Sequence, residues 1–458
     1  MLLVHNRCKI IFKKYIPLFP DDRGESELYM SLITKQIADG INLTYVETDK
    51  FKTGMLSVNF IAPLDSASAA KNALIPNILM RGSVKYPNMA QINKKLDYLY
   101  ASSLAARNMK RGERQIFGIS AGMINSDYAM NGEDLVIEVT DVLGDILLNP
   151  VTCGEAFDAA YTESEKRNLI DAINAKINNK ALYARQRCIK EMCKNERFGL
   201  DETGTAEEVA ACTAENVYAQ YKTALETYPV EIFFVGKCDI DALADKLTEL
   251  FSGIERKPIA MPQTEIIRTC DKPKTVVEDM PVNQGKLTIG FRSGITVFDA
   301  DYPALMMFNE VFGGGVTSKL FMNVREKMSL CYYCASAPDA AKGLLIVASG
   351  IEVANREIAE KAIFDQLDAV KRGEISDDEI TGARLGLINN YKELADSASG
   401  LESWYIGRRL AGLDGAPEDM IEAIAAVSRD DIAAAANKAT LDTVYFLNGT
   451  LKGAQTNA

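Results

Sequence analysis

The chain alternates between short stretches of strand-like and helix-like patterning. Strands are predicted where apolar and polar residues alternate and β-branched residues are frequent; in the first half these are 41–50, 55–64, 115–124, 127–131 and 230–236. Helices are predicted where apolar residues recur at helical spacing; in the first half these are 69–80, 89–100, a segment ending before Pro150, 155–194, 214–225 and 239–251. Gly82 follows the first helix, where a left-handed glycine can end it.

The same order of elements begins again in the second half of the chain. The elements that match the first half are a strand at 285–294, helices at 302–312 and 318–326, and a strand at 443–449. A repeat of this length implies two copies of one α+β domain, each a mostly antiparallel sheet packed with helices. We therefore expect an amino-terminal extension and two domains joined by a linker; their bounds are 1–39, 40–253, 254–270 for the linker, and 271–458.

Composition narrows the possible partners and compartments. Of the 458 residues, 47% are apolar and 25% are charged, as in globular proteins. A net charge of −12 argues against a surface that binds nucleic acid or anionic membranes. The amino-terminal segment has no apolar run of signal-peptide length, no later segment reaches the length of a membrane span, and the nine scattered cysteines suit a reducing compartment. We therefore expect a cytoplasmic protein.

The only histidine in the sequence is His5. A catalytic site that needs two imidazoles therefore cannot be built from one copy of this chain.

The most specific local signal is the segment 312–332, FGGGVTSKLFMNVREKMSLCY. It resembles the second-domain signature of the insulinase and pitrilysin metallopeptidases (inverzincins), especially the mitochondrial-processing-peptidase branch. Residues 213–239 resemble the end of that family's first domain, and residues 375–412 resemble its late second-domain helices. The resemblance extends from about residue 40 to residue 450 and implies a fold that forms one half of a clam-shell peptidase chamber.

The zinc motif that the resemblance implies is degenerate in this chain. In the family, the first and last residues of a helical His-x-x-Glu-His bind zinc, and the glutamate between them is the general base. The matching residues here are Ala73 and Asn77 for the ligands and Pro76 for the base, and none of them can serve that role. The family's distal ligand falls at Asp171 or Ala172. We therefore expect no metal and no catalysis in this chain, and the simplest alternative is that these are ordinary helix residues.

The second-domain half of the family's site is present. An arginine and a tyrosine seven residues apart hydrogen-bond the bound peptide in the family, and they match Arg325 and Tyr332. By residue type alone, Arg325 would instead be a surface ion-pairing residue and Tyr332 a half-buried strand aromatic.

Three further features of the sequence have simpler interpretations. The run Gly313, Gly314 and Gly315 lacks the Gly-Lys-Ser/Thr of a phosphate loop and resembles the glycine-rich loop of noncatalytic processing-peptidase subunits. The spacing of Cys331 and Cys334 is redox-like but lacks a strand that leads through the motif into a helix. The acidic residues Glu163, Glu165 and Asp171 are predicted to lie on a solvated helix face.

These features predict a noncatalytic, substrate-binding subunit of a heterodimeric zinc peptidase. The expected partner is a related chain with an intact His-x-x-Glu-His that supplies the zinc, and the expected substrate is a peptide or an unfolded protein. Paired chains of this kind occur in bacteria, and some resemble insulinase-like proteins associated with elongation factor P modification. The alternative is a scaffold protein of the same fold with no role in proteolysis. A metal-free enzyme has no nucleophile and base to support it.

Overall fold

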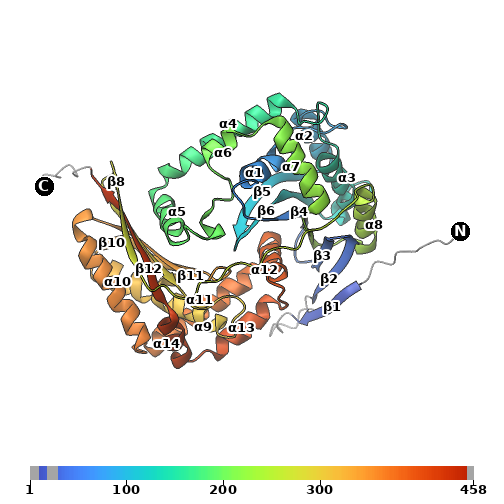
Figure 1. The fold of residues 1–458 in the computed structure, drawn as a ribbon. Coiled ribbons are helices and arrows are strands. Elements are labelled where there is room, and N and C mark those ends of the chain that lie inside the picture. The colour runs from blue at the N-terminus through green and yellow to red at the C-terminus, as the bar shows by residue number, and fades with distance from the viewer. Residues whose placement is uncertain (1–9, 18–28, 451–458) are drawn as a thin grey trace. The chain divides into compact units, whose positions relative to one another are not determined.

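The computed structural model describes residues 10–17 and 29–450, which form two compact units, each a sheet with helices packed on it (Figure 1). The first unit takes in residues up to 173, 201–263 and 396–406, and the second takes in 174–200, 264–395 and 407 onward. The expected α+β fold with two sheets is confirmed. Each unit also contains one segment from the other half of the sequence.

The sheet of the first unit has seven strands in the order β1-β2-β3-β7-β4-β6-β5, and every neighbouring pair is antiparallel except β3 and β7. The strands are β1 Ile10–Pro17, β2 Tyr29–Ala38, β3 Ile41–Glu47, β4 Thr53–Pro63, β5 Ser103–Arg111, β6 Arg114–Ile124 and β7 Val230–Gly236. Alternate residues of β4, namely Leu56, Val58 and Phe60, point into the hydrophobic core.

Helices of the first unit cover that apolar face. They are α1 Ala69–Leu79, α2 Met89–Tyr98, α3 Leu135–Leu148, α4 Ala159–Ala175, α6 Ala206–Ala210, α7 Ala214–Thr227 and α8 Ile240–Phe251. Helices α1 and α3 contact β6, and α7 packs on α1. Leu74 and Ile78 of α1 belong to the same buried cluster as the β4 side chains. The helix that matches the family's zinc helix is therefore part of the core.

The opposite face of this sheet is polar and is covered by the first half of α12, Ala398–Ala411. Glu402 is 1% exposed there and accepts hydrogen bonds from Ser57 and Arg107, and from Asn59 Nδ2 at 3.4 Å. Ser57 and Asn59 are the β4 residues that alternate with the apolar ones. A single buried carboxylate therefore satisfies polar groups from two strands, as burial requires.

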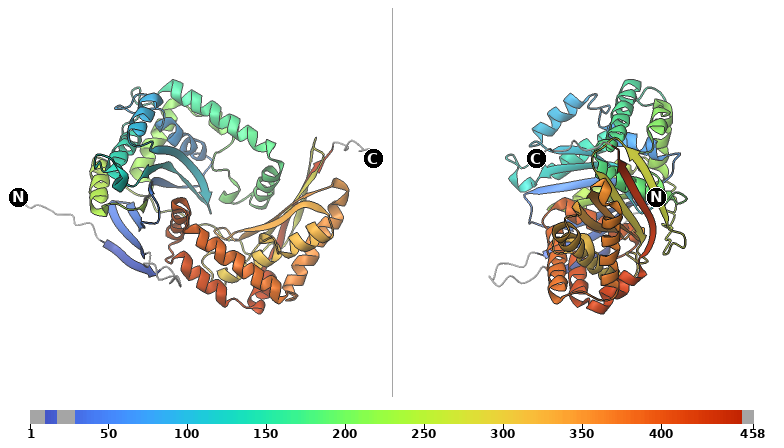
Figure 2. Two further views of the ribbon diagram at one scale, coloured as in Figure 1. Left: turned by 180° about the vertical axis from the view of Figure 1, so that it is seen from behind. Right: turned by 90° about the vertical axis from the view of Figure 1, so that its left-hand side faces the viewer.

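The sheet of the second unit has five strands in the order β10-β11-β9-β12-β8, and only β12 and β8 are parallel. The strands are β8 Lys274–Met280, β9 Gly285–Arg292, β10 Cys331–Asp339, β11 Leu344–Ile351 and β12 Thr440–Gly449. The helices of this unit are α5 Lys180–Met192, α9 Tyr302–Asn309, α10 Arg356–Lys371, α11 Asp377–Leu394, α13 Pro417–Ala426 and α14 Arg429–Lys438. Figure 2 shows the carboxyl-terminal helices of this unit, in orange to red, on one side of the sheet.

Both faces of the second sheet are also covered. Phe291 packs against Phe364 of α10 with 6.2 Å between the ring centroids. On the other face α5 lies against β9 and β12, and a Cβ at Gly290 would come within 2.1 Å of Met192 Sδ. Glycine at position 290 is therefore required by the close approach of α5.

A buried ion-pair network secures the end of α5. Arg292 is 3% exposed and lies 2.7 Å from carboxylate oxygens of both Glu196 and Asp442. Lys342, which has no exposed surface, adds a second cation at 2.7 Å from Glu196. These charges compensate one another inside the unit, as buried charges must.

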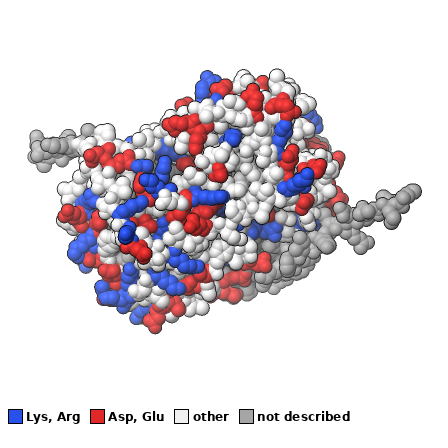
Figure 3. All heavy atoms as spheres, viewed as in Figure 1, with Lys and Arg blue, Asp and Glu red and all other residues white. Residues whose placement is uncertain are grey.

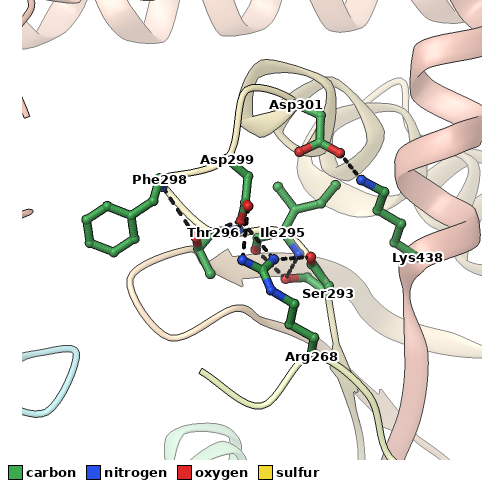
Figure 4. A network of polar contacts seen from close by, with 9 residues as sticks. Arg268, Ser293, Ile295, Thr296, Phe298, Asp299, Asp301 and Lys438 are labelled. Atoms are coloured by element: carbon green, nitrogen blue, oxygen red, sulfur yellow. Dashed lines mark hydrogen bonds and ion pairs between the residues drawn. The ribbon is translucent and has the colours of Figure 1, made fainter. Parts of the chain in front are cut away.

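Residues 254–270 form neither helix nor strand. Arg268 fastens this segment to the loop after β9, donating to both carboxylate oxygens of Asp299 at 2.9 and 3.0 Å and to the Gly294 carbonyl at 2.6 Å (Figure 4). The Asp299 carboxylate also accepts from the backbone N–H and the hydroxyl of Thr296. The hydrogen bonds from Arg268 lower the pKa of Asp299 to about 2.

Several predicted elements differ from the structure. The expected amino-terminal extension, residues 1–39, for which no element was predicted, supplies β1 and β2. No strand forms over residues 127–131, and the first two of them belong to a short 3₁₀ turn, Ser126–Tyr128. The long helix expected over 155–194 is divided into α4 and α5 by the 3₁₀ turn Lys176–Asn178.

Two further predictions were wrong in part: the conformation of Gly82, and the type of the helices at 302–312 and 318–326. Gly82 does not adopt a left-handed conformation; a Cβ there would meet the Pro87 carbonyl oxygen at 2.6 Å, so close backbone approach explains this glycine. The helices predicted at 302–312 and 318–326 are partly π-helical, over Glu310–Gly314 (η4) and Leu320–Lys327 (η5). π-Helical turns are rare overall, but those that occur are often found at functional sites.

Candidate functional site

Helix α1 contains the degenerate zinc motif. Ala73 is 2% exposed and packs in the core, whereas Asn77 is exposed. The Asn77 amide donates to the backbone carbonyl of Ala73 at 3.4 Å, so its side chain bonds within its own helix. Pro76 lies inside the helix and provides no N–H, yet its carbonyl still accepts from Met80 N at 3.2 Å. The helix forms through hydrophobic packing and offers no set of metal ligands at these positions.

The candidate distal ligands do not compensate for this loss. Asp171 and Ala172 are both exposed on α4. Among the residues that the structure describes, no group of three or more histidine, cysteine, aspartate or glutamate residues is arranged to hold a metal ion. His5 lies outside the described residues.

Glu165 corrects the expectation that the acidic residues of α4 form one solvated face. Its side chain is 11% exposed and forms an ion pair with Arg81, which follows α1. Arg81 also donates to Ser164 at 3.1 Å, and Asn168 donates to Glu165 at 3.2 Å. Glu163 is 60% exposed and pairs with Lys166, as a surface residue would. Glu165 therefore connects the end of α1 to α4.

In the second unit, Arg325 and Tyr332 lie next to each other. Arg325 projects from η5, donates from Nε to the Tyr332 carbonyl oxygen at 3.1 Å, and places its guanidinium 4.5 Å from the centre of the Phe321 ring. Its side chain is 37% exposed, and Glu326 lies 3.3 Å away. The aromatic face and the carbonyl orient a guanidinium that solvent can still reach.

The Tyr332 phenol is 58% exposed and donates to Glu352 Oε1 at 2.9 Å. This hydrogen bond raises the pKa of Tyr332, because the carboxylate stabilises the protonated phenol. The phenol therefore remains a hydrogen-bond donor at neutral pH. Sequence reasoning did not identify Glu352, and its position twenty residues away gave no signal.

The glycine run lies at the end of η4 and packs against Glu310. A Cβ at Gly314 or Gly315 would come within 2.6 or 2.5 Å of the Glu310 carboxylate oxygens, and a Cβ at Gly313 would be 2.8 Å from Ser336 N. Burial raises the pKa of Glu310. Val316 follows at 72% exposed, so the run leads from a packed turn to a solvent-exposed tip.

The two cysteines of β10 are brought together. The buried Cys334 thiol hydrogen-bonds Cys331, which lowers the pKa of Cys331 to about 7, and Arg325 contributes in the same direction. The sequence shows that the two cysteines are three residues apart. It does not show the β-bulge in β10, which turns both side chains to the same side of the sheet.

The described surface shows no single dominant charge on the face drawn in Figure 3, where basic and acidic side chains are intermixed. No helix in the described part of the chain is long and apolar enough to cross a membrane.

Comparison with known proteins adds independent information. The family profile described as "Peptidase M16 inactive domain" matches residues 211–387. A Bacillus subtilis (strain 168) protein named "Probable inactive metalloprotease YmfF" is 37% identical over 411 residues, which cover 90% of this chain and 96% of that protein.

Solved structures have the same fold. A conserved protein from Enterococcus faecalis V583 has a TM-score of 0.85 and 28% identity, covering 92% of this chain and 100% of that one. A peptidase M16 inactive domain from Pseudomonas fluorescens has a TM-score of 0.74 and 17% identity, covering 92% and 99%.

Proposed function

Because the chain belongs to the M16 peptidase family as an inactive homologue, we propose that it is the noncatalytic, substrate-binding subunit of a heterodimeric zinc metallopeptidase. The partner would be a related chain with an intact His-x-x-Glu-His, which supplies the metal and the general base. The substrate would be a peptide or an unfolded protein segment, and the complex would act in the cytoplasm.

The observation that carries this proposal is the pairing of Arg325 with Tyr332. Both side chains are accessible, at 37% and 58% exposed, and both are oriented by neighbours rather than free to rotate. A guanidinium donates in a planar fork and a phenol donates a single hydrogen bond, which are the groups that suit peptide carbonyl oxygens. Orientation before binding reduces the entropy lost when a ligand is held.

The alternative is a scaffold of the same fold. Hydrophobic packing holds α1 together without any ligand, and a scaffold needs nothing more than such packing. A scaffold, however, has no need for an exposed, preoriented arginine and tyrosine, and this observation favours the substrate-binding subunit.

Co-expression with the related zinc-bearing chain from the same cell tests the proposal. We expect a stable complex, with on the order of 1,200 Å² or more of buried surface, that contains zinc and hydrolyses peptides. Each chain expressed alone is the control, and neither should hydrolyse peptides at the rate of the complex. Repeated isolation of this chain without the zinc-bearing relative would contradict the proposal. A stable complex whose turnover does not depend on Arg325 and Tyr332 would support the scaffold.

A further inference from the structure

Strand β10 contains a β-bulge at Tyr332. Cys331 is paired with Ile351 of β11, but Tyr333 is paired with Gly350, so β10 has one residue more than its partner at this point. In a regular strand, residues three apart point to opposite faces. The extra residue shifts the alternation, so that Cys331 and Cys334 point to the same side.

The two thiols differ in accessibility. Cys334 is 3% exposed, whereas Cys331 is only partly buried. Cys334 is placed to donate to the Cys331 sulfur, and the Ser349 hydroxyl of β11, which donates to the Tyr333 carbonyl at 3.0 Å, lies beside both thiols. One thiol is therefore accessible to small reagents, and the other supports it from inside the unit.

Charges near Cys331 favour its thiolate. Arg325 of η5 attracts the thiolate directly. The acidic groups on this side already have partners, because Glu326 lies 3.3 Å from the Arg325 guanidinium and Glu352 accepts from the Tyr332 phenol.

We propose that Cys331 is a thiol–disulfide exchange site that forms mixed disulfides with low-molecular-mass disulfides, with Cys334 as its buried hydrogen-bond donor. The Cys331 thiolate attacks one sulfur of the small disulfide, whose S–S bond breaks as the new S–S bond forms. The departing thiolate takes up a proton equivalent to the one that Cys331 released. Two thiol–disulfide pairs exchange, so no further oxidant is needed.

The reactivity follows from ionisation. With a pKa of about 7, Cys331 is about half ionised at pH 7, whereas an ordinary thiol with a pKa of ~8.5 is ~3% ionised. Because nucleophilicity falls as the thiol pKa falls, the net gain in rate is roughly threefold. Burial raises the pKa values of Cys188, Cys193 and Cys238, so these thiols are expected to react much more slowly.

Cys334 has the role of donor and not of resolving thiol. The hydrogen bond to Cys331 and burial raise the pKa of Cys334, and its burial persists when Cys331 is in a mixed disulfide, so Cys334 is expected to stay protonated and to attack that disulfide only slowly. The adduct is therefore expected to persist beside Tyr332 and Arg325. That this adduct would block peptide binding rests on the proposed function, whereas the chemistry at Cys331 does not.

The test uses the isolated chain with glutathione disulfide as the probe, with each cysteine followed by peptide mass spectrometry from pH 6 to 9. We expect the first adduct at Cys331, with a rate profile whose midpoint lies near pH 7. Cys331→Ser should remove this fast phase, while Cys153→Ser, which changes an exposed thiol, should leave it unchanged. The rate ranking of the native cysteines needs no variant and so does not depend on the folding of any mutant.

The role of Cys334 is tested by a second pair of variants. Cys334→Ala should raise the midpoint and slow the reaction at pH 7 by up to about threefold, the whole gain expected from ionisation, and Cys334→Ser, which keeps a donor, should retain more of the rate. Equal reactivity of Cys153 and Cys331 would overturn the proposal. A Cys331–Cys334 disulfide as the main product would also overturn it, because Cys334 would then be a resolving thiol. Either result can be obtained whether or not a peptidase partner exists.

Discussion

The Arg325 side chain donates to the backbone carbonyl of Tyr332 at 3.1 Å, so the arginine is tied to the extra residue of the β10 bulge and not to its phenol. The phenol is bound separately, by Glu352. The two side chains can therefore be altered separately. Tyr332→Phe removes the phenol hydroxyl but keeps the backbone carbonyl, so the hydrogen bond from Arg325 that joins η5 to β10 remains.

In a reconstituted complex, Arg325→Ala and Tyr332→Phe should each lower peptide turnover by ~10²-fold, because each removes a hydrogen-bond donor to the bound peptide. Assembly and the zinc content of the partner should not change. Steady-state kinetics and size-exclusion chromatography measure these effects. Arg325→Lys should recover only part of the activity, because an ammonium group lacks the planar fork. Unaltered kinetics in both variants, with the complex intact, would show that the pair is structural.

The purified chain should contain no stoichiometric zinc, because Ala73, Pro76 and Asn77 provide neither ligands nor a base. Elemental analysis after dialysis measures this directly, with the zinc-bearing relative as the positive control. About one zinc per chain would refute the assignment of α1 as a degenerate motif.

Glu165→Gln should destabilise the first unit by about 2 kcal/mol, because it leaves the Arg81 charge partly buried without its carboxylate. The matched control is Glu163→Gln on the same helix, which is 60% exposed and should cost less than about 0.5 kcal/mol. Urea unfolding of both variants gives the comparison. Equal losses would mean that the Arg81 ion pair contributes no more than a surface pair.

Much of the fold could be predicted from periodicity. The strands with strong alternation, such as β4 with Leu56 and Val58, were located within two or three residues, as were the helices α1, α2, α7 and α8. Strand β5 was missed because its residues are mostly half-exposed and include several charged side chains, and β8 was missed for the same reason. The division between α4 and α5 was missed because the 3₁₀ turn that separates them contains no glycine or proline.

The candidate site was predictable only where a family signature marks it. The signature located Arg325 and Tyr332, but nothing in the sequence identified Glu352 as the acceptor of the phenol. Glu165 was assigned to the surface because its neighbours in sequence are polar, whereas its burial depends on Arg81, 84 residues earlier. Contacts of this separation require the tertiary structure.

The acid sensitivity of the second unit should include a contribution from Asp299. The Arg268 hydrogen bonds hold its pKa at about 2 in the folded state, below the ~3.9 of an unfolded aspartate. A lowered folded pKa stabilises the protein above the unfolded pKa, and this contribution disappears as the pH falls from about 4 to about 2. Asp299→Asn should therefore be less stable than the native chain at pH 6, and the difference should shrink below about pH 4 and disappear near pH 2.

Urea titrations at a series of pH values check this convergence. If the difference in unfolding free energy between the native chain and Asp299→Asn remained constant from pH 6 to pH 2.5, the ion pair in Figure 4 would not be linked to stability.

The late position of α12 in the sequence has a consequence for folding during translation. The first unit takes residues 396–406 into its structure, and the polar groups of Ser57, Asn59 and Arg107 are satisfied by Glu402. During synthesis, all seven strands of this unit's sheet, which ends with β7 at Gly236, are therefore translated well before the carboxylate that completes the polar face of the sheet. The polar face of that sheet must stay hydrated until residues 396–406 emerge, when most of the second unit has also been translated, so the first unit completes its fold late in synthesis.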